Sequence, residues 1–318
     1  MTEIVPVTPS ALLQPEPIDI IERLLQDKRS PNTRHAYQKD LRDFFNFLAS
    51  SPPTPELVAQ FLSLPRFDAI AKVFKYKAWL MDKGLSEATV NRRLSAIKSM
   101  VRLAQNLGKC SWSLDHIKGE KVRQYRDTSG IARQDFKRVL ENCDRSTLKG
   151  KRDYALLRLL WDNALRRGEI AKCNIQDFNA ERRTLKIRGK GRGTEVEVVH
   201  LANSTVQALL AWLQARRELK VKAPLFVSLD RAHKGHRLTG SAIYGIVQQA
   251  CLEAGISKKM SPHRIRHSSI TAALDMTDGN VRKAQKLSRH RNLNTLMIYD
   301  DNRNQDQLEL SELLANLT

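Results

Sequence analysis

Four residues near the end of the sequence could act together on a phosphate group. They are His263, Arg266, His290 and Tyr299, and all lie within about forty positions of one another. Arginine and histidine bind and polarise phosphate oxygens, and a tyrosine hydroxyl can attack phosphorus. The set is therefore suited to phosphate chemistry.

Two earlier residues, Arg166 and Lys190, supply what this set lacks. Cleavage of a phosphodiester needs a nucleophile, positive charge on the nonbridging oxygens and an acid for the leaving oxygen. Arg166 and Arg266 can each hold phosphate oxygens through a planar fork. Lys190, in the glycine-rich run Gly189–Gly193, can donate a proton to the leaving oxygen, and the two histidines can shuttle protons. The phenol of Tyr299 has an ordinary pKa of about 10, so its attack needs nearby cations or a base.

Each of these residues, taken singly, also has a structural explanation. Gly-Lys-Gly at 189–191 lacks the spacing of a Walker loop, and most such turns are only turns. His263 and His267, four positions apart, could bind a metal on a helix, but they lack the glutamate of a zinc protease. Tyr299 follows two large apolar residues and would usually be a core residue in such a context. Their joint occurrence favours a phosphate site over these separate explanations.

The composition indicates a basic protein with packed cores. The chain has 318 residues, 41% of them hydrophobic, which is enough for two domains. Its formal net charge of +20 favours a polyanionic partner, most often nucleic acid, over a merely basic surface. The absence of a long apolar run and of a signal peptide predicts a cytoplasmic location. Free thiols are expected because no CxxC occurs among Cys110, Cys143, Cys173 and Cys251.

The first part of the chain predicts a helical domain. Residues 1–18 are expected to form a flexible lead-in, and residues 19–110 the domain itself. The apolar stripe from Tyr37 to Leu48 predicts a core face rather than a stacking surface for bases. Helices are expected at 20–25, around 37–48, from 55, at 69–81 and at 86–106.

Basic side chains gather on the last of these helices and in the segment after it. Residues 111–130 have little periodicity and many charges, as expected of an interdomain linker. A basic helix face is usually solvated surface, but the net charge of the chain favours contact with DNA phosphates. The candidate DNA-binding residues are Arg92, Arg93, Lys98, Arg102, Lys121 and Arg123.

Residues 131–318 are expected to form a second, mainly helical domain that contains the clearest β signal. The alternating segments 184–188 and 194–198 flank the glycine-rich run and predict a hairpin with Lys190 at its tip. The expected fold class is therefore mainly α with a small β-hairpin or sheet. Helices are expected at 153–160, 204–219 and 238–255, and the tail carries leucines at 308, 310, 313, 314 and 317.

Together these motifs resemble those of the tyrosine recombinase, or phage integrase, family. Ala164–Glu169 resembles the box of the family's first arginine, and Gly189–Gly191 resembles its hairpin lysine. His263–His267 matches the His-x-x-Arg-His box, and His290 followed nine positions later by Tyr299 matches the final histidine and the nucleophile. The order and the spacing make the resemblance specific.

The resemblance extends over almost the whole chain from about residue 20. Thr33-x3-Tyr37-x2-Asp40-Leu41 and Thr89–Leu94 resemble the family's N-terminal, SAM-like core-binding domain. This implies a C-shaped clamp of two domains around DNA. The short lead-in leaves no room for the arm-site domain of lambda-type integrases, so the build is similar to that of Cre or the Xer recombinases.

The resemblance implies a site-specific recombinase. Tyr299 would form a 3′-phosphotyrosine and free a 5′-hydroxyl, and a hydroxyl of the partner strand would reverse the attack. The bond energy would be kept in the phosphotyrosine, so the resemblance implies that no cofactor and no metal are needed. The family works as a homotetramer on two DNA sites, and the leucine-rich tail would dock on a neighbouring protomer unless it is an ordinary last helix of its own chain. The other roles implied are phosphate stabilisation by Arg166 and Arg266, protonation of the leaving oxygen by Lys190, proton transfer by His263, a phosphate hydrogen bond from His290 and support of the arginines by Glu169.

Two positions depart from the family pattern. Asn163-Ala164 stands where Thr-Gly is common, and Arg289 stands where glycine usually precedes the last histidine. Neither change removes a reacting group, but Arg289 could alter DNA contact or helix packing. Two other hypotheses are a non-catalytic DNA-binding protein of the same build and a type IB topoisomerase that acts alone. The sequence leaves open whether the task is integration, excision, inversion or dimer resolution.

Overall fold

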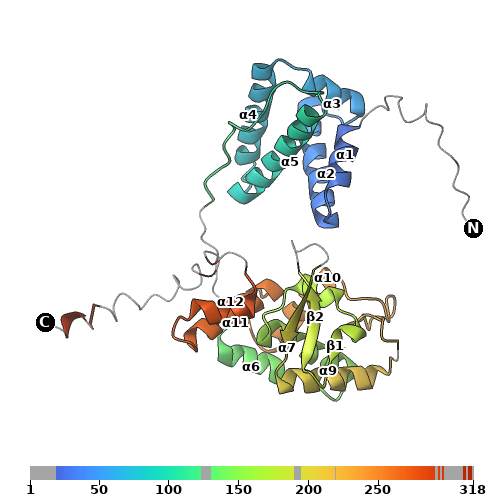
Figure 1. The fold of residues 1–318 in the computed structure, drawn as a ribbon, viewed down its shortest axis with the longest axis vertical. Coiled ribbons are helices and arrows are strands. Elements are labelled where there is room, and N and C mark those ends of the chain that lie inside the picture. The colour runs from blue at the N-terminus through green and yellow to red at the C-terminus, as the bar shows by residue number, and fades with distance from the viewer. Residues whose placement is uncertain are drawn as a thin grey trace, which may run out of the picture. The chain divides into compact units, whose positions relative to one another are not determined.

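The computed structural model divides the chain into two units, Met1–Tyr125 and Arg126–Thr318 (Figure 1). Each unit has its own hydrophobic core. Within the described residues the fold is mainly helical with one small sheet, so the expected fold class is confirmed. The structure describes residues 19–122, 130–189, 195–218 and 220–290, and also 293, 296, 311–312 and 314–316.

Several helices of the first unit begin where the sequence offers a cap. Asp19, Ser30 and Thr54 each accept hydrogen bonds from backbone N–H groups in the turn that follows them. After Ser30 and Thr54, a proline occupies the first helical position. The N–H group that proline lacks has no partner within a helix at this position, so no hydrogen bond is lost. The helices are α1 (Ile20–Asp27), α2 (Pro31–Ala49), α3 (Pro55–Leu62), α4 (Arg66–Asp82) and α5 (Glu87–Asn106).

Aromatic rings fill the centre of this unit. Phe44 lies edge-on to Phe45, Phe61 and Tyr76, with ring centroids between 5.1 and 5.3 Å apart. All four side chains are buried. The stripe from Tyr37 to Leu48 is therefore a core face, which confirms that part of the sequence interpretation.

Two boundaries in this unit differ from those expected. Helix α4 begins at Arg66 rather than at Ala69, directly after a proline. The first part of the expected linker, residues 112–117, packs on the core of this unit, and the indole Nε1 of Trp112 donates to the carbonyl oxygen of Leu64 at 2.9 Å. These contacts join residues far apart in the chain, so they leave no periodic pattern in the segment itself.

The second unit is built around the apolar helix α7. Four of its leucines, Leu156, Leu157, Leu159 and Leu160, are fully buried, and the helix packs against α9 and α11. The elements of this unit are α6 (Arg133–Glu141), α7 (Leu148–Asp162), α8 (Arg167–Lys172), the 3-10 turn Ile175–Asp177, β1 (Phe178–Asn179), β2 (Thr184–Arg188), β3 (Val196–His200), α9 (Asn203–Arg216), α10 (Gly240–Glu253), α11 (Pro262–Asp275) and α12 (Val281–Ser288).

A three-stranded antiparallel sheet of order β1-β2-β3 lies in this unit. The expected hairpin is present as β2 and β3, with Arg188 opposite Val196. Its second strand begins at Val196 rather than at Thr194, and β1 was not expected because two residues are too short to show alternation. Alternate residues of β2, Leu185 and Ile187, are fully buried.

A small separate core ties the C-terminal helices to the turn after α7. Ala164 packs with Ile270 and Leu274 of α11 and with Ala284 of α12, and all four side chains are at most 1% exposed. This cluster brings the end of α7, the start of α8 and the end of α12 to one place. None of the helices in the described residues has the length and apolar character needed to span a bilayer.

Candidate active site

Arg166 is held at the start of α8 by Glu169. The chain leaves α7, turns through Asn163–Leu165 and enters α8 directly after Arg166. Glu169 Oε2 accepts the backbone N–H of Arg166 at 2.9 Å, and Oε1 lies 2.7 Å from its Nη1. A glutamate in the third helical position is suited to this return contact. The Arg166 side chain is still 35% exposed, so its guanidinium can also reach a ligand.

Arg266 joins the two turns that surround the site. It lies in the second turn of α11, which Ser261 caps and Pro262 opens. The residue is buried, with 1% of its surface exposed. Its Nη1 donates to the carbonyl oxygen of Ala164, and its Nη2 donates to that of Ser288. Arg266 thereby fixes the end of α12 against the turn that precedes Arg166.

His290 lies beside this guanidinium. Its Nε2 is 3.3 Å from Nη2 of Arg266, and its carbonyl oxygen accepts from the Gln285 side chain at 3.0 Å. The pKa of His290 is lowered to about 4, first by burial and then by four nearby groups: Arg266, Arg166, Arg289 and His263. The ring is therefore neutral at pH 7 and can accept a hydrogen bond from Arg266.

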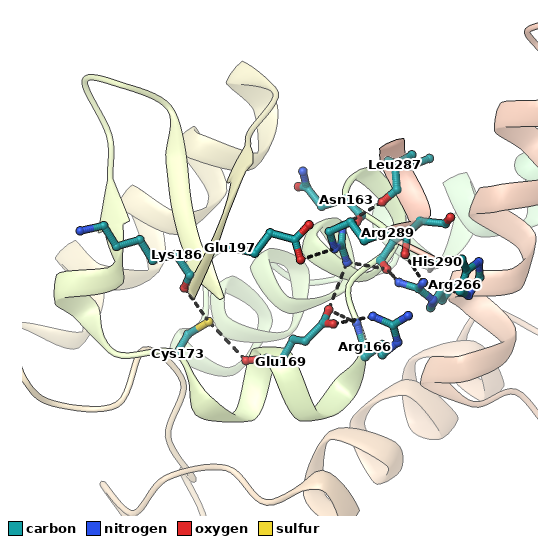
Figure 2. A network of polar contacts seen from close by, with 12 residues as sticks. Asn163, Arg166, Glu169, Cys173, Lys186, Glu197, Arg266, Leu287, Arg289 and His290 are labelled. Atoms are coloured by element: carbon teal, nitrogen blue, oxygen red, sulfur yellow. Dashed lines mark hydrogen bonds and ion pairs between the residues drawn. The ribbon is translucent and has the colours of Figure 1, made fainter. Parts of the chain in front are cut away.

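Arg289 occupies the centre of this network, as Figure 2 shows. Its side chain is 6% exposed, and its Nη2 lies 3.1 Å from Oε2 of Glu169. Burial alone would raise the pKa of Glu169, but the charges of Arg289 and Arg166 and the backbone N–H of Arg166 outweigh it and hold that pKa below its ordinary value. The sequence interpretation treated Arg289 as a departure from a pattern that could alter DNA contact or helix packing, and it did not predict the pair with Glu169. The available signal was the pair of non-glycine residues, Ala164 and Arg289, at two positions where glycine is common.

His263 stands one turn before His267 on α11. The Nε2 atoms of the two rings are 2.7 Å apart, and their planes are nearly perpendicular. His263 is exposed whereas His267 is 5% exposed, so the inner ring orients the outer one. This arrangement leaves His263 at the surface of the site, on the same helix as Arg266.

The structure thus brings Arg166, Arg266 and His290 together, with Glu169 behind them. Two candidates, Lys190 and Tyr299, lie outside the described residues. The lysine belongs to the segment between β2 and β3, and the tyrosine follows α12 by eleven positions, Ser288 being its last residue. The catalytic roles of all six residues stay predictions.

The candidate DNA-binding residues differ in how their charges are already used. Arg93 is 13% exposed, lies 2.9 Å from Asp43 and donates to the Tyr76 hydroxyl at 3.1 Å. Arg102 pairs with Asp115 at 2.8 Å, but both side chains are more than half exposed. The remaining four divide as follows: Arg92 pairs with Asp40, Lys98 donates to the Ile117 carbonyl, Lys121 is exposed, and Arg123 lies outside the described residues.

Two family models match this chain. The model of the phage integrase family matches residues 130–306, and the model of the phage integrase N-terminal SAM-like domain matches residues 21–108. Together they cover most of the two units.

The chain is also similar to curated proteins. It is 50% identical to a tyrosine recombinase of Synechocystis sp. over 94% of this chain and 95% of that protein. It is 48% identical to a tyrosine recombinase of Synechococcus elongatus over 100% of this chain and 99% of that protein. The tyrosine recombinase XerD of Listeria monocytogenes is 27% identical over 88% and 90% of the two chains.

Two solved structures share the fold. The XerH site-specific recombinase, in a post-cleavage complex with a palindromic difH substrate, aligns with a TM-score of 0.64 at 20% identity, over 93% of this chain and 95% of that chain. A lambda integrase dimer bound to a COC′ core site aligns with a TM-score of 0.64 at 13% identity, over 90% and 94% of the chains.

Proposed function

The chain belongs to the phage integrase family of tyrosine recombinases, and we propose that it cuts and rejoins DNA at specific sites through a 3′-phosphotyrosine. In the cleavage step, Oη of Tyr299 bonds to the scissile phosphorus while the bond from phosphorus to the 5′-oxygen breaks. The phenolic proton passes to His263, and Lys190 gives a proton to the 5′-oxygen, which leaves as a hydroxyl. A 5′-hydroxyl of the partner strand then attacks the phosphotyrosine and restores the phosphodiester.

The observation that carries this proposal is the gathering of Arg166, Arg266 and His290 around the Ala164 turn. Negative charge grows on the nonbridging oxygens as the fifth bond to phosphorus forms, and fixed cations stabilise it without moving. Arg166 keeps an exposed guanidinium for this purpose. His290 is neutral at pH 7, so its ring can lie beside the phosphate site without adding a buried charge.

Double-stranded DNA is the proposed partner. The net charge of +20 matches a polyanion that contacts both units. The two solved structures described above hold a difH substrate and a core site, and the present chain shares their fold. We extend the proposal to a homotetramer on two DNA sites in the cytoplasm, with the leucine-rich tail docked on a neighbouring protomer. Most of that tail lies outside the described residues.

A covalent trapping experiment tests the proposed function. The full chain is incubated with a library of nicked duplexes, in which the 5′-hydroxyl fragment diffuses away after cleavage and strands the protein on DNA. The wild type is expected to give an adduct that survives denaturing electrophoresis, Tyr299→Phe is expected to give none, and Tyr244→Phe serves as the matched control that keeps it. An absent wild-type adduct, or one that persists in the Tyr299→Phe chain, would exclude the mechanism.

A further inference from the structure

The side chain of Arg289 connects three separate parts of the site. Its Nη1 donates to the carbonyl oxygens of Asn163 at 2.9 Å and Leu287 at 2.8 Å. Its Nη2 donates to Oε2 of Glu169 at 3.1 Å and to the carbonyl oxygen of Ala164 at 3.3 Å. One guanidinium therefore holds the end of α12, the turn after α7 and the carboxylate that orients Arg166 (Figure 2).

The backbone at Arg289 is unfavourable for a residue with a side chain. Its φ is +56°, and that of Ala164 is +45°, both in the left-handed region that glycine adopts most easily. A non-glycine residue keeps such a conformation when its surroundings hold it there. Here the hydrogen bonds of the Arg289 side chain can hold both turns at once, because they end on the carbonyl of Ala164 itself.

The charge of Arg289 changes what Arg166 can offer to an anion. Glu169 is 2% exposed and pairs with the guanidinium of Arg166 through Oε1 and with that of Arg289 through Oε2. Without Arg289, the pair of Arg166 and Glu169 would be neutral in sum. With it, the three closely paired groups retain one net positive charge. Glu197, whose Oε2 lies 3.9 Å from Nε of Arg289 and whose side chain is 23% exposed, offsets that charge only in part. Of the two arginines only Arg166 is appreciably exposed.

We propose that Arg289 is a positioning residue for the cleavage step: it locks Glu169 and the Asn163–Ala164 turn so that Arg166 faces the phosphate beside the fixed charge of the buried Arg266, and it offsets the charge of Glu169. This assignment rests on the proposed function. Arg289 does not itself touch the phosphate, because its side chain is 6% exposed and both of its terminal nitrogens bind protein acceptors.

Single-turnover kinetics distinguish this role from a direct contact with DNA. At saturating nicked duplex, Arg289→Met is expected to slow adduct formation by about 10- to 100-fold, as small misplacements of reacting groups do. The dissociation constant and its salt dependence are expected to stay close to those of the wild type. Arg289→Lys, which keeps the charge but lacks the fork, should lie between the two. The matched control is Arg282→Met, a change at an exposed arginine of α12, the helix that ends just before Arg289. This variant should react at the wild-type rate.

A titration without DNA separates positioning from a general loss of stability. The groups that face His290 are Arg266 and His263 of α11, Arg166 before α8 and Arg289 after α12, and all four lower its pKa. NMR titration of the His290 ring in the full chain should therefore show a higher pKa in Arg289→Met than in the wild type. If Arg289→Met does not fold, the rate of adduct formation and the salt dependence of binding measured on Arg289→Lys decide, because lysine keeps the charge but lacks the fork.

Three results would overturn the assignment. One is an Arg289→Met chain that cleaves at the wild-type rate. Another is a decrease of about one in the slope of DNA affinity against salt concentration, both on logarithmic scales. This would indicate the loss of one phosphate contact and make Arg289 a DNA ligand. The last is an unchanged His290 titration. Wild-type adduct formation tests the proposed function by itself, and the titration needs no DNA, so the two failures can be told apart.

Discussion

The guanidinium of Arg266 and the imidazole of His290 lie in direct contact, with Nη2 of the arginine 3.3 Å from Nε2 of the histidine. The contact requires a neutral ring, because a protonated Nε2 has no lone pair to accept the arginine N–H. It also places a hydrogen-bonding imidazole beside a buried cation, at the point where the end of α12 meets α11. The protonation state of His290 therefore links the stability of this region to the geometry of the phosphate site.

The first prediction concerns pH. The pKa of His290 is lowered from 6.5 to about 4 in the folded chain, first by burial and then by its charged neighbours, so between these values the unfolded chain binds a proton that the folded chain does not. The free energy of unfolding contributed by this group is therefore complete above pH 6.5 and falls as the pH is lowered towards 4. Urea denaturation across this range should show a steeper loss for the wild type than for His290→Gln. Parallel curves would contradict the assigned environment.

The second prediction compares two arginine-to-lysine changes. Arg166→Lys should slow adduct formation by about 100-fold or more while it changes stability little, because the side chain is 35% exposed but its fork is needed at the phosphate. Arg266→Lys should slow the reaction and also destabilise the fold by about 2 kcal/mol, because the carbonyls of Ala164 and Ser288 lose the hydrogen bonds that the guanidinium of Arg266 donates. Single-turnover rates and urea denaturation measure both. The two side chains differ in burial, so the two variants should differ in their free energies of unfolding. An equal loss in both variants would contradict this prediction.

The third prediction concerns the carboxylate between two arginines. Glu169→Gln should lower the free energy of unfolding by about 3 kcal/mol, because Arg289 loses its nearer counterion and keeps only the longer contact of 3.9 Å with Glu197. Adduct formation should slow as well, since the fork of Arg166 is no longer held by an ion pair. Glu181→Gln, at an exposed position in a turn, is the control and should change neither quantity. A fully stable Glu169→Gln chain would mean that the charge of Arg289 is compensated elsewhere.

The fourth prediction separates DNA contact from structure on α5. Arg102→Ala should weaken DNA binding and reduce its salt slope by about one, with little effect on stability, because its ion pair with Asp115 is exposed. Arg93→Ala should instead destabilise the first unit by about 3 kcal/mol, because its guanidinium is largely buried between Asp43 and Tyr76. Filter binding across a salt series and thermal unfolding measure the two effects. A reversed pattern would exchange the roles assigned to these residues.

Much of the fold and part of the site follow from local patterns. Residues three positions apart on a helix share a face, so His263 and Arg266 could be placed together from their spacing alone. Ser261 and Pro262 indicate the start of that helix, and the alternation at 184–188 indicates the first strand of the hairpin. Such features depend on neighbours in the sequence, which is why they could be predicted.

Contacts between distant segments could not be predicted in the same way. The hydrogen bonds of Arg289 to Asn163 and Glu169 join residues that are more than a hundred positions apart in the sequence. No periodic pattern around these residues indicates that they are in contact. The burial of Trp112 likewise depends on a contact with Leu64, and the helices α4 and α5 separate these two residues in the sequence. In both cases the sequence shows a polar or irregular segment, and only the tertiary structure shows what satisfies it.

The most direct test of the central claim is to identify the amino acid that becomes bonded to DNA. Adduct from the nicked duplex is digested with protease and nuclease, and the nucleotide-linked peptide is sequenced by mass spectrometry. We expect the link at Tyr299, on the 3′-phosphate side of the break, with a free 5′-hydroxyl on the released fragment. A link to any other residue, or to a 5′-phosphate, would contradict the account.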